Sequence, residues 1–150
     1  MGSNQSNAIS RVLVPYDGSA PAAESVRFAL ETFPDADVEV LHVVEPFAEH
    51  TDAGMEDYRR RWRERALRRA AETLEGAQAV AEEYDRSVET EWCYGRPGHE
   101  IVAHLEGGEF DHVVMGSRGR TGLERVMLGS VAETTLRRSP VPVTVIPDRR

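Results

Sequence analysis

Short apolar runs alternate with longer amphipathic segments from one end of this chain to the other. The runs have the length and residue types of buried β-strands, and the segments between them have helical periodicity or helix-start signals. The expected strands are Arg11–Pro15, Val38–Val44, Ser87–Tyr94, His112–Met115 and Val141–Ile146. The expected helices are one capped by Ser19 that ends near Phe33, then about Asp52–Tyr84, His99–Leu105 and Ser130–Arg138. Strands that alternate with helices form parallel β-α-β units with right-handed crossovers, so the pattern predicts an α/β fold in three layers.

The length of 150 residues fits one domain with a proper core. We expect residues 1–8 to form a flexible N-terminus and residues 9–147 to form the single domain. No apolar run approaches the roughly 18 residues that cross a bilayer, and the N-terminus lacks the apolar centre of a signal peptide. A single cysteine, Cys93, leaves no intramolecular disulfide and fits a reducing compartment. The expected location is the cytoplasm, without attachment to a membrane.

Acidic residues outnumber basic ones by 26 to 18, which gives a formal net charge of −8, and every basic residue is arginine. Such a surface disfavours binding to nucleic acid or to an anionic membrane, and it keeps a protein soluble where salt screens charge. One interpretation is a halophilic protein adapted to a salty cytoplasm. The other is a genome of high GC content, which favours arginine codons over lysine codons. Composition leaves both interpretations open.

Two local patterns that resemble functional sites have simpler interpretations. The basic run Arg59–Arg69 contains an aromatic residue, as nucleic-acid-binding segments do. Acidic residues interleave with it at helical spacing, so the run is better interpreted as an exposed, ion-paired helix face. The histidines show no metal-ligand spacing with one another or with Cys93, so we expect no zinc site.

The segment from Gly116 to Ser130 is the strongest candidate for a binding site. It begins where a buried strand ends and finishes where a helix begins, so the unpaired N–H groups and positive dipole end of that helix offer an anion site. Its glycines let backbone N–H groups approach phosphate oxygens closely. Ser130 either caps the helix or donates its hydroxyl to phosphate. A long connecting loop with structural glycines is the alternative, and glycine content alone does not decide between them.

Two familiar phosphate-binding patterns do not fit this segment. A Walker A loop needs a lysine after its second glycine, and the chain contains no lysine. The glycine spacing also differs from the tight G-x-G-x-x-G of dinucleotide enzymes. A ligand here would be held mainly by backbone donors. Arg118, Arg120 and Arg125 either add a local positive patch or remain solvated loop charges.

The spacing G-x2-G-x9-G-S, formed by Gly116, Gly119, Gly129 and Ser130, resembles the ATP-binding motif of the universal stress protein family. Four further segments resemble the family at the corresponding places: VLVPYDGS, VEVLHVVEP, YGRPGHEIV and SPVPVTVIP. The resemblance covers roughly residues 9–147. No motif position departs from the pattern, which favours the ATP-binding branch of the family over the branch that has lost these glycines.

The resemblance implies a five-stranded parallel sheet in the order 3-2-1-4-5 with helices on both faces, a Rossmann-like fold of the adenine nucleotide alpha hydrolase-like type. It also implies a nucleotide over the carboxyl ends of the first and fourth strands, and ligands of open α/β sheets bind where strand order reverses in this way. The implied adenine contacts are Pro15, the backbone of Val43 and Met115, and the implied ribose contacts are Asp17 and Gly116. The implied phosphate contacts are Ser117, Gly119, Gly129, Ser130 and the N–H of Val131. The residues alone also allow Asp17 to form an Asx turn with Gly18, and they allow Val43 and Met115 to be core residues.

The resemblance further implies ATP as the ligand, with Mg²⁺ or Mn²⁺ bridging its phosphates, because such ions usually bring few protein ligands of their own. It implies a homodimer that pairs through the edge strand Val141–Ile146, and an unidentified protein partner. The expected function is nucleotide-dependent regulation in the stress response, with no catalytic residues and little or no turnover. Two alternatives stay open: a slow ATP-hydrolysing enzyme, and an interaction module that uses the fold without nucleotide.

Overall fold

The computed structural model describes residues 8–46, 56–118 and 128–148, and the predicted alternation of strands and helices is confirmed within these ranges. The strands are β1 (Arg11–Pro15), β2 (Asp37–Val44), β3 (Glu89–Tyr94), β4 (His112–Gly116) and β5 (Val143–Ile146). The helices are α1 (Ala20–Thr32), α2 (Glu56–Glu82), α3 (Pro97–Gly107) and α4 (Ser130–Arg138).

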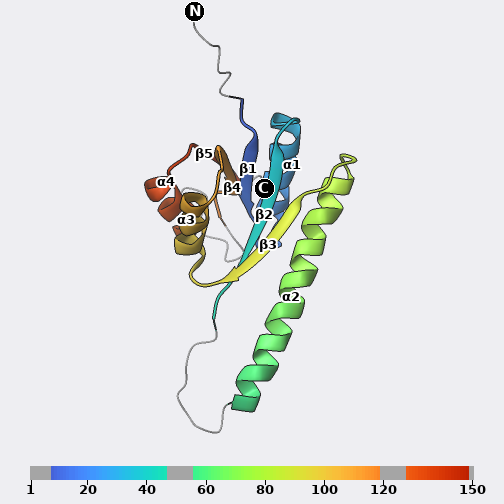
Figure 1. Cartoon of the computed structure of the whole chain (residues 1–150), viewed down its shortest axis with the longest axis vertical. Coiled ribbons are helices and arrows are strands. Elements are labelled where there is room, and N and C mark those ends of the chain that lie inside the picture. The colour runs from blue at the N-terminus through green and yellow to red at the C-terminus, as the bar shows by residue number, and fades with distance from the viewer. Residues whose placement is uncertain (1–7, 47–55, 119–127, 149–150) are drawn as a thin grey trace, which may run out of the picture.

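The five described strands form one parallel sheet in the order β3-β2-β1-β4-β5, as predicted. The order reverses between β1 and β4, which are neighbours in the sheet although two other strands lie between them in sequence. Figure 1 shows α1 and α2 on one face of the sheet and α3 and α4 on the other. β3 and β5 form the two edges. The predicted three-layer α/β fold is therefore confirmed.

Two apolar cores lie on the two faces of the sheet. Successive side chains of a strand point to opposite faces, so β1, β2 and β4 supply both cores. Val12 and Val14 of β1 pack with α1 and α2, whereas Leu13 of the same strand packs with α3. The same alternation decides which side chains at the carboxyl ends of the strands face α1 and α2, and which face α3 and α4.

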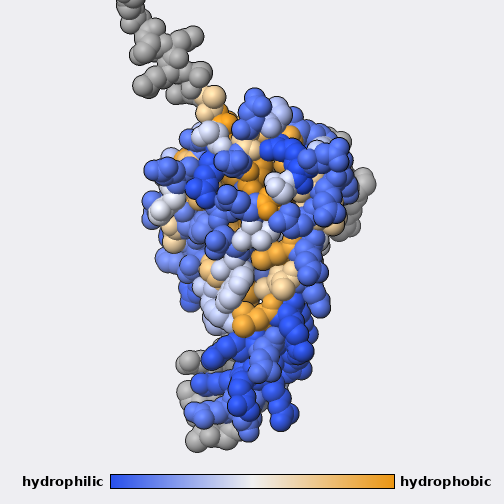
Figure 2. All heavy atoms as spheres, turned by 45° about the vertical axis from the view of Figure 1, so that its right-hand side comes forward, coloured by the Kyte–Doolittle hydropathy of each residue, from blue (hydrophilic) through white to orange (hydrophobic). Residues whose placement is uncertain are grey.

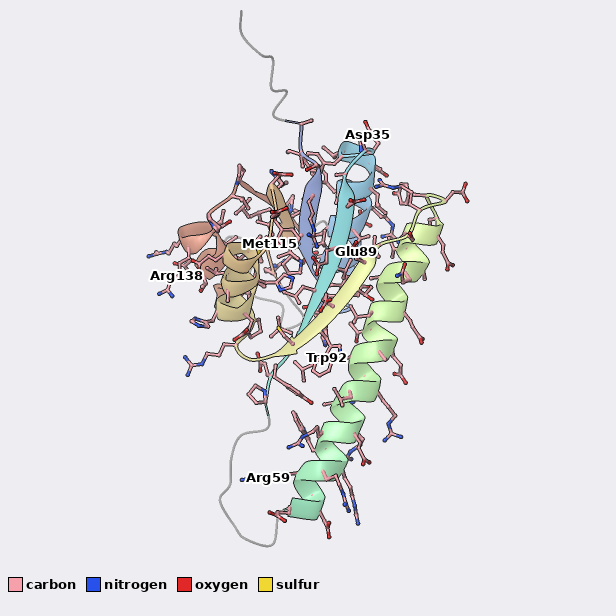
Figure 3. All side chains as sticks on the ribbon, in the orientation of Figure 1. Asp35, Arg59, Glu89, Trp92, Met115 and Arg138 are labelled. Atoms are coloured by element: carbon pink, nitrogen blue, oxygen red, sulfur yellow. The ribbon has the colours of Figure 1, made fainter. Side chains whose placement is uncertain are left out.

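Helix α2 is longer than the part of the sheet that it covers. Its buried residues, from Ala70 to Ala81, all lie in the second half of the helix. The first half carries the arginine-rich run and projects past the carboxyl ends of the strands, with Arg59 on the projecting part (Figure 1, Figure 3). Figure 2 shows that this projecting part is hydrophilic, while apolar atoms gather on the body above it. No helix in the described parts of the chain is long and apolar enough to cross a membrane.

Strand β3 begins at Glu89 rather than at the predicted Ser87. Just before Glu89, a side chain of α2 makes the backbone hydrogen bonds that a neighbouring strand would otherwise make. The amide nitrogen of Gln78 donates to the carbonyl of Val88 at 2.7 Å, and its amide oxygen accepts the N–H of Val88 at 3.3 Å. The backbone of Val88 is therefore satisfied before the strand pairs with β2. The predicted position of this strand at a sheet edge is confirmed.

The starts of helix α3 and strand β5 also differ from the predicted ones. Helix α3 begins at Pro97 rather than His99, since a proline at the first helical position lacks only an N–H that would be unpaired there anyway. Strand β5 begins at Val143 rather than Val141, because the hydroxyl of Ser139 bonds both the N–H and the carbonyl of Val141. That local contact takes the backbone of Val141 out of the sheet.

Candidate functional site

A cleft of about 660 Å³ opens at the carboxyl ends of β1, β2 and β4. Residues of these strands, of the connections that follow them and of all four described helices line it. The strand order reverses at this edge of the sheet, which is where ligands of open α/β folds bind. The cleft brings together nine of the predicted site residues: Pro15, Asp17, Val43, Met115, Gly116, Ser117, Gly129, Ser130 and Val131. The remaining one, Gly119, lies outside the described residues.

The three predicted adenine contacts form an apolar wall on one side of this cleft. Val43 packs against the core under α3. Pro15 and Met115 follow Val14 and Val114, which face α1 and α2, so by alternation they also face the α3 side. Met115 is buried in its strand and also lines the cleft. It is therefore a core residue and at the same time lies where a ligand contact is expected. Figure 3 shows Met115 between β4 and α3.

The connection between β1 and α1 holds Asp17 in a defined turn. One carboxylate oxygen of Asp17 accepts the N–H of Ser19 at 2.9 Å, which is the Asx turn that the residues alone allowed. Gly18 between them has a φ of 81°, a conformation that favours glycine. The hydroxyl of Ser19 then caps α1 by accepting the N–H of Ala22 at 3.3 Å, as predicted. The second oxygen of Asp17 has no partner among the described residues and remains available to a ligand.

Two glycines of the predicted motif occupy close-packed positions. A Cβ on Gly116 would lie 2.8 Å from the Cβ of Pro21 in α1, and a Cβ on Gly129 would lie 3.1 Å from the carbonyl oxygen of Ser117. The N–H of Gly129 donates to that same oxygen at 2.8 Å, and the N–H of Ser117 donates to the carbonyl of Ile146 at 2.8 Å. Both glycines therefore have a structural role, as the alternative interpretation of the glycine segment proposed. The N–H groups of Ser117 and Gly129 already donate to backbone carbonyls. Their expected phosphate contacts stay a prediction, and other atoms of these two residues would have to make them.

The start of α4 supplies the unpaired donors of the cleft. Its N-cap is Gly129, which makes no side-chain cap, and Ser130 is the exposed first residue of the helix. Of the two roles that the sequence leaves open for Ser130, capping of the helix is therefore excluded, and donation to a phosphate stays a prediction. The N–H groups of Ser130, Val131 and Ala132 have no acceptor among the described residues, as the geometry of a first turn requires, and all three residues line the cleft. The helix dipole adds a partial positive charge at the same place.

Arg118 does not contribute a free charge to the cleft. Its side chain is 5% exposed, and its guanidinium donates to a carboxylate oxygen of Asp148 at 2.6 Å. Neither prediction for Arg118, a positive patch or a solvated loop charge, is correct. The ion pair ties the end of β4 to the segment after β5. Arg120 and Arg125 lie outside the described residues.

Sequence reasoning missed several cleft residues, some of which reach the cleft only through the tertiary position of α2. Arg69 and Thr73 of α2 line the cleft, as does Tyr16 after β1. The helical spacing of Arg69 and Thr73 could be read from the sequence, but the place where α2 passes the sheet could not. His42 also lines the cleft, with its Nδ1 2.8 Å from the carbonyl oxygen of Tyr16.

Two features concern the metal and thiol chemistry of the described residues. They contain no group of three or more His, Cys, Asp and Glu side chains that could hold a metal ion. Cys93 is half-buried in β3, and burial, followed by the negative charges of Glu100 and Glu91, raises the pKa of its thiol. A raised pKa lowers the thiolate fraction at neutral pH, so this thiol is a weak nucleophile.

Comparison with solved structures shows a shared fold. MJ0577 of Methanocaldococcus jannaschii aligns with a TM-score of 0.80 at 26% identity, over 95% of this chain and 99% of that one. A universal stress protein family protein of Arabidopsis thaliana with AMP bound aligns with a TM-score of 0.67 at 18% identity, over 93% of this chain and 92% of that one. The universal stress protein of Archaeoglobus fulgidus in complex with dAMP aligns with a TM-score of 0.67 at 22% identity, over 93% and 98%. At these two lower identities the likeness shows the fold alone.

Comparison of sequences gives the family. Universal stress protein MJ0531 of Methanocaldococcus jannaschii is 33% identical, over 95% of this chain and 85% of that protein. Universal stress protein YxiE of Bacillus subtilis is 30% identical, over 91% of this chain and 97% of that protein. A model of the universal stress protein family matches residues 8–147. The chain belongs to the universal stress protein family.

Proposed function

We propose that this chain is an ATP-binding universal stress protein, in which the bound nucleotide biases the conformation of the protein or its choice of partner. One observation carries the proposal: the unpaired N–H groups at the start of α4 and the half-buried carboxylate of Asp17 line the same cleft. A nucleotide needs both, since its phosphates require donors and its ribose hydroxyls require an acceptor. Two proteins of the same fold were solved with AMP or dAMP bound, which supports an adenine nucleotide as the class of ligand.

The apolar wall of Pro15, Val43 and Met115 suits the base of such a nucleotide. A planar, apolar base gains most from burial against a surface of this kind, whereas its edge needs a few polar partners. In the proposed complex these come from the backbone of Val43. The volume of the cleft, about 660 Å³, lies within the range of about 300–1,000 Å³ that is typical of small-molecule sites.

The phosphates would lie at the start of α4, against the N–H groups of Ser130 and Val131. The hydroxyl of Ser130 adds one more donor, because it is exposed and does not cap the helix. A Mg²⁺ or Mn²⁺ ion, when bound, would neutralise part of the phosphate charge. Its ligands would be phosphate oxygens and water, since such ions usually bring few protein ligands of their own.

The arrangement favours a binding role over rapid hydrolysis. Hydrolysis of ATP needs a group that orients the attacking water near the terminal phosphate, together with donors for the developing charge. The carboxylates among the described cleft residues are Asp17 and Glu45, which follow β1 and β2 rather than lying at the start of α4. We therefore expect phosphate release far slower than about one per second. A faster rate at saturating ATP would make the chain an enzyme.

Titration of the purified protein with ATP and Mg²⁺ by calorimetry tests the proposal, with Asp17→Asn as the diagnostic variant. Asparagine keeps the side-chain oxygen that accepts the N–H of Ser19, so the turn persists. It loses the second acceptor oxygen, so we expect ATP binding to weaken about tenfold, the lower end of the range for a hydrogen bond to a charged group.

The matched control is Glu45→Gln, which removes one negative charge from the same cleft. Charge removal alone favours an anionic ligand, so this control should bind ATP at least as tightly as the original protein. Equal ATP affinity of all three proteins would contradict the role of Asp17. Absence of ATP binding by the original protein, at both low and high salt, would contradict the proposed function.

We also propose a homodimer through β5, which forms one edge of the described sheet. The carbonyls of Pro142 and Ile146 accept N–H groups from β4 and from the residue after it. By the alternation of a parallel strand, the backbone groups of Val143 and Val145 point away from β4. An exposed edge of this kind pairs readily with another chain unless it is protected. Antiparallel pairing of two copies would satisfy both edges at once.

A further inference from the structure

The cleft continues across the edge of the sheet to the face that α1 and α2 cover. Pro15, Val43 and Met115 lie on the other face, so the contacts proposed for adenine use only one side. On the α2 side the cleft is lined by Tyr16, His42, Arg69 and Thr73, together with small apolar residues. Tyr16 belongs to the core under α1 and α2. This part of the cleft is unused by the proposed nucleotide contacts.

The side chain of Tyr16 is largely buried, and its hydroxyl is a donor without a partner among the described residues. The side chain is 7% exposed, and its oxygen lies against α2 at Gly76, where a Cβ would be 3.2 Å away. The backbone of Tyr16 is held on both sides by β2: its N–H donates to Leu41 at 2.8 Å, and its carbonyl accepts from Nδ1 of His42 at 2.8 Å. Its hydroxyl makes no hydrogen bond within the described residues. Burial raises the pKa of Tyr16, so the group keeps its proton and acts as a donor.

Arg69 and Thr73 bring a charge and a second hydroxyl to the same place. They are four residues apart on α2 and therefore share one face of the helix. Neither makes a side-chain hydrogen bond or ion pair with the described residues. The other described arginine of the cleft, Arg118, is held by Asp148. Arg69 is thus the cation that the described part of the cleft offers to an anionic ligand, and its planar guanidinium matches the oxygens of a phosphate.

We propose that Tyr16, Arg69 and Thr73 form a second phosphate-binding position in the cleft. It lies on the α2 side of the sheet, whereas the start of α4 lies beyond β4 on the opposite face (Figure 1). Arg69 supplies the charge, and the two hydroxyls donate to the remaining oxygens. The phosphate belongs either to a separate small molecule or to a second phosphate group on the bound nucleotide.

Calorimetric titration with inorganic phosphate at low ionic strength tests the position without any nucleotide. Arg69→Gln should weaken phosphate binding at least tenfold, and Tyr16→Phe and Thr73→Val should each weaken it by a smaller factor. The matched control is Arg68→Gln, since Arg68 is exposed on the same helix and does not line the cleft. It removes the same charge and should leave phosphate binding within about twofold of the original.

A second variant separates the two phosphate positions. Ser130→Pro removes an N–H and a hydroxyl at the start of α4 and touches nothing on the α2 side. Phosphate binding that Ser130→Pro keeps and Arg69→Gln loses supports the proposal. Phosphate binding that Arg69→Gln leaves unchanged, or the absence of binding at millimolar phosphate, overturns it. Failure to bind ATP would contradict the proposed function alone, because this titration contains no nucleotide.

Two further titrations identify the source of the phosphate. If the nucleotide supplies it, adenosine 3′,5′-bisphosphate binds at least tenfold more tightly than AMP, and Arg69→Gln abolishes that difference. If a separate molecule supplies it, the two nucleotides bind equally and the AMP-saturated protein still binds inorganic phosphate through Arg69. Either result supports the position. Equal binding of the two nucleotides, with no phosphate uptake by the AMP-saturated protein, overturns it.

Discussion

Gly116 at the end of β4 lies directly against Pro21 of α1, so close that a Cβ on the glycine would be 2.8 Å from the Cβ of the proline. The proline ring cannot move aside without moving the first turn of α1. That turn begins at Ser19, whose N–H donates to a carboxylate oxygen of Asp17. The contact therefore links the strand that leads into the glycine segment with the turn that holds the carboxylate of the cleft.

Gly116→Ala should destabilise the protein by about 1–3 kcal/mol, the usual cost of overpacking a close contact. The matched control is Gly107→Ala at the end of α3, where a Cβ would meet nothing within 4 Å. That change should be neutral or stabilising by up to about 1 kcal/mol, because alanine favours a helix over glycine. Urea unfolding of both variants measures the difference. Equal stabilities would contradict the tight packing of Gly116 against Pro21.

His112 in β4 should make the protein lose stability as the pH falls below about 6.5, the ordinary pKa of histidine. Its Nε2 shares a 2.6 Å hydrogen bond with the hydroxyl of Thr144, while its Nδ1 is buried with no partner among the described residues. Burial lowers the pKa of His112, so the folded protein binds a proton less readily than the unfolded chain. The contribution of His112 to the unfolding free energy is therefore fully present above the pKa that it has in the unfolded chain. It is lost as the pH falls through the lower pKa that it has in the folded protein.

His112→Gln supplies the comparison, since glutamine keeps a polar group for Thr144 and does not titrate. Urea unfolding at pH 7.5 and pH 5.5 should show a larger loss of unfolding free energy in the original protein than in the variant. Contributions from the other histidines are common to both proteins and cancel. An identical loss in the two proteins would contradict the neutral, buried state assigned to His112.

Val145→Pro should convert the proposed homodimer into monomers without unfolding the sheet. The backbone N–H of Val145 points away from β4, so proline removes a donor only from the free edge, where it is tolerated. Val145→Thr keeps the N–H and should remain dimeric. Analytical ultracentrifugation gives the mass, and circular dichroism checks the fold. A Val145→Pro protein that stays dimeric would show that β5 does not form the interface.

Much of the fold could be predicted because the pattern of apolar residues depends on sequence neighbours alone. Arg11–Pro15 and Ser130–Arg138 have the bounds that the sequence predicts. The starts of β3 and β5 could not be predicted in this way. They depend on side chains of Gln78 and Ser139 that bond backbone groups, and residue periodicity contains no signal for such bonds.

The cleft was predictable where a motif follows a strand and unpredictable where tertiary packing brings a residue in. Asp17 and the start of α4 flank strand ends, so the switch of strand order brings them together. Arg118 was misjudged because its partner, Asp148, lies 30 residues away. Arg69 was missed because its role depends on where α2 passes the end of the sheet.

The N–H groups at the start of α4 are central to the account, and one substitution removes the first of them with little disturbance. Gly129 has a ψ of 154°, which suits the residue before a proline, and proline is favoured at the first helical position. Ser130→Pro should therefore fold normally while lacking one N–H and one hydroxyl. Ser130→Ala lacks only the hydroxyl.

The most direct measurement is calorimetric titration of the original protein and these two variants with ATP and Mg²⁺. We predict saturable binding by the original protein, a modest loss in Ser130→Ala, and a further loss in Ser130→Pro of about tenfold, as expected for a hydrogen bond to a charged group. Equal affinity of Ser130→Pro and Ser130→Ala would contradict the role of the helix start. No binding of ATP by the original protein would contradict the proposed function itself.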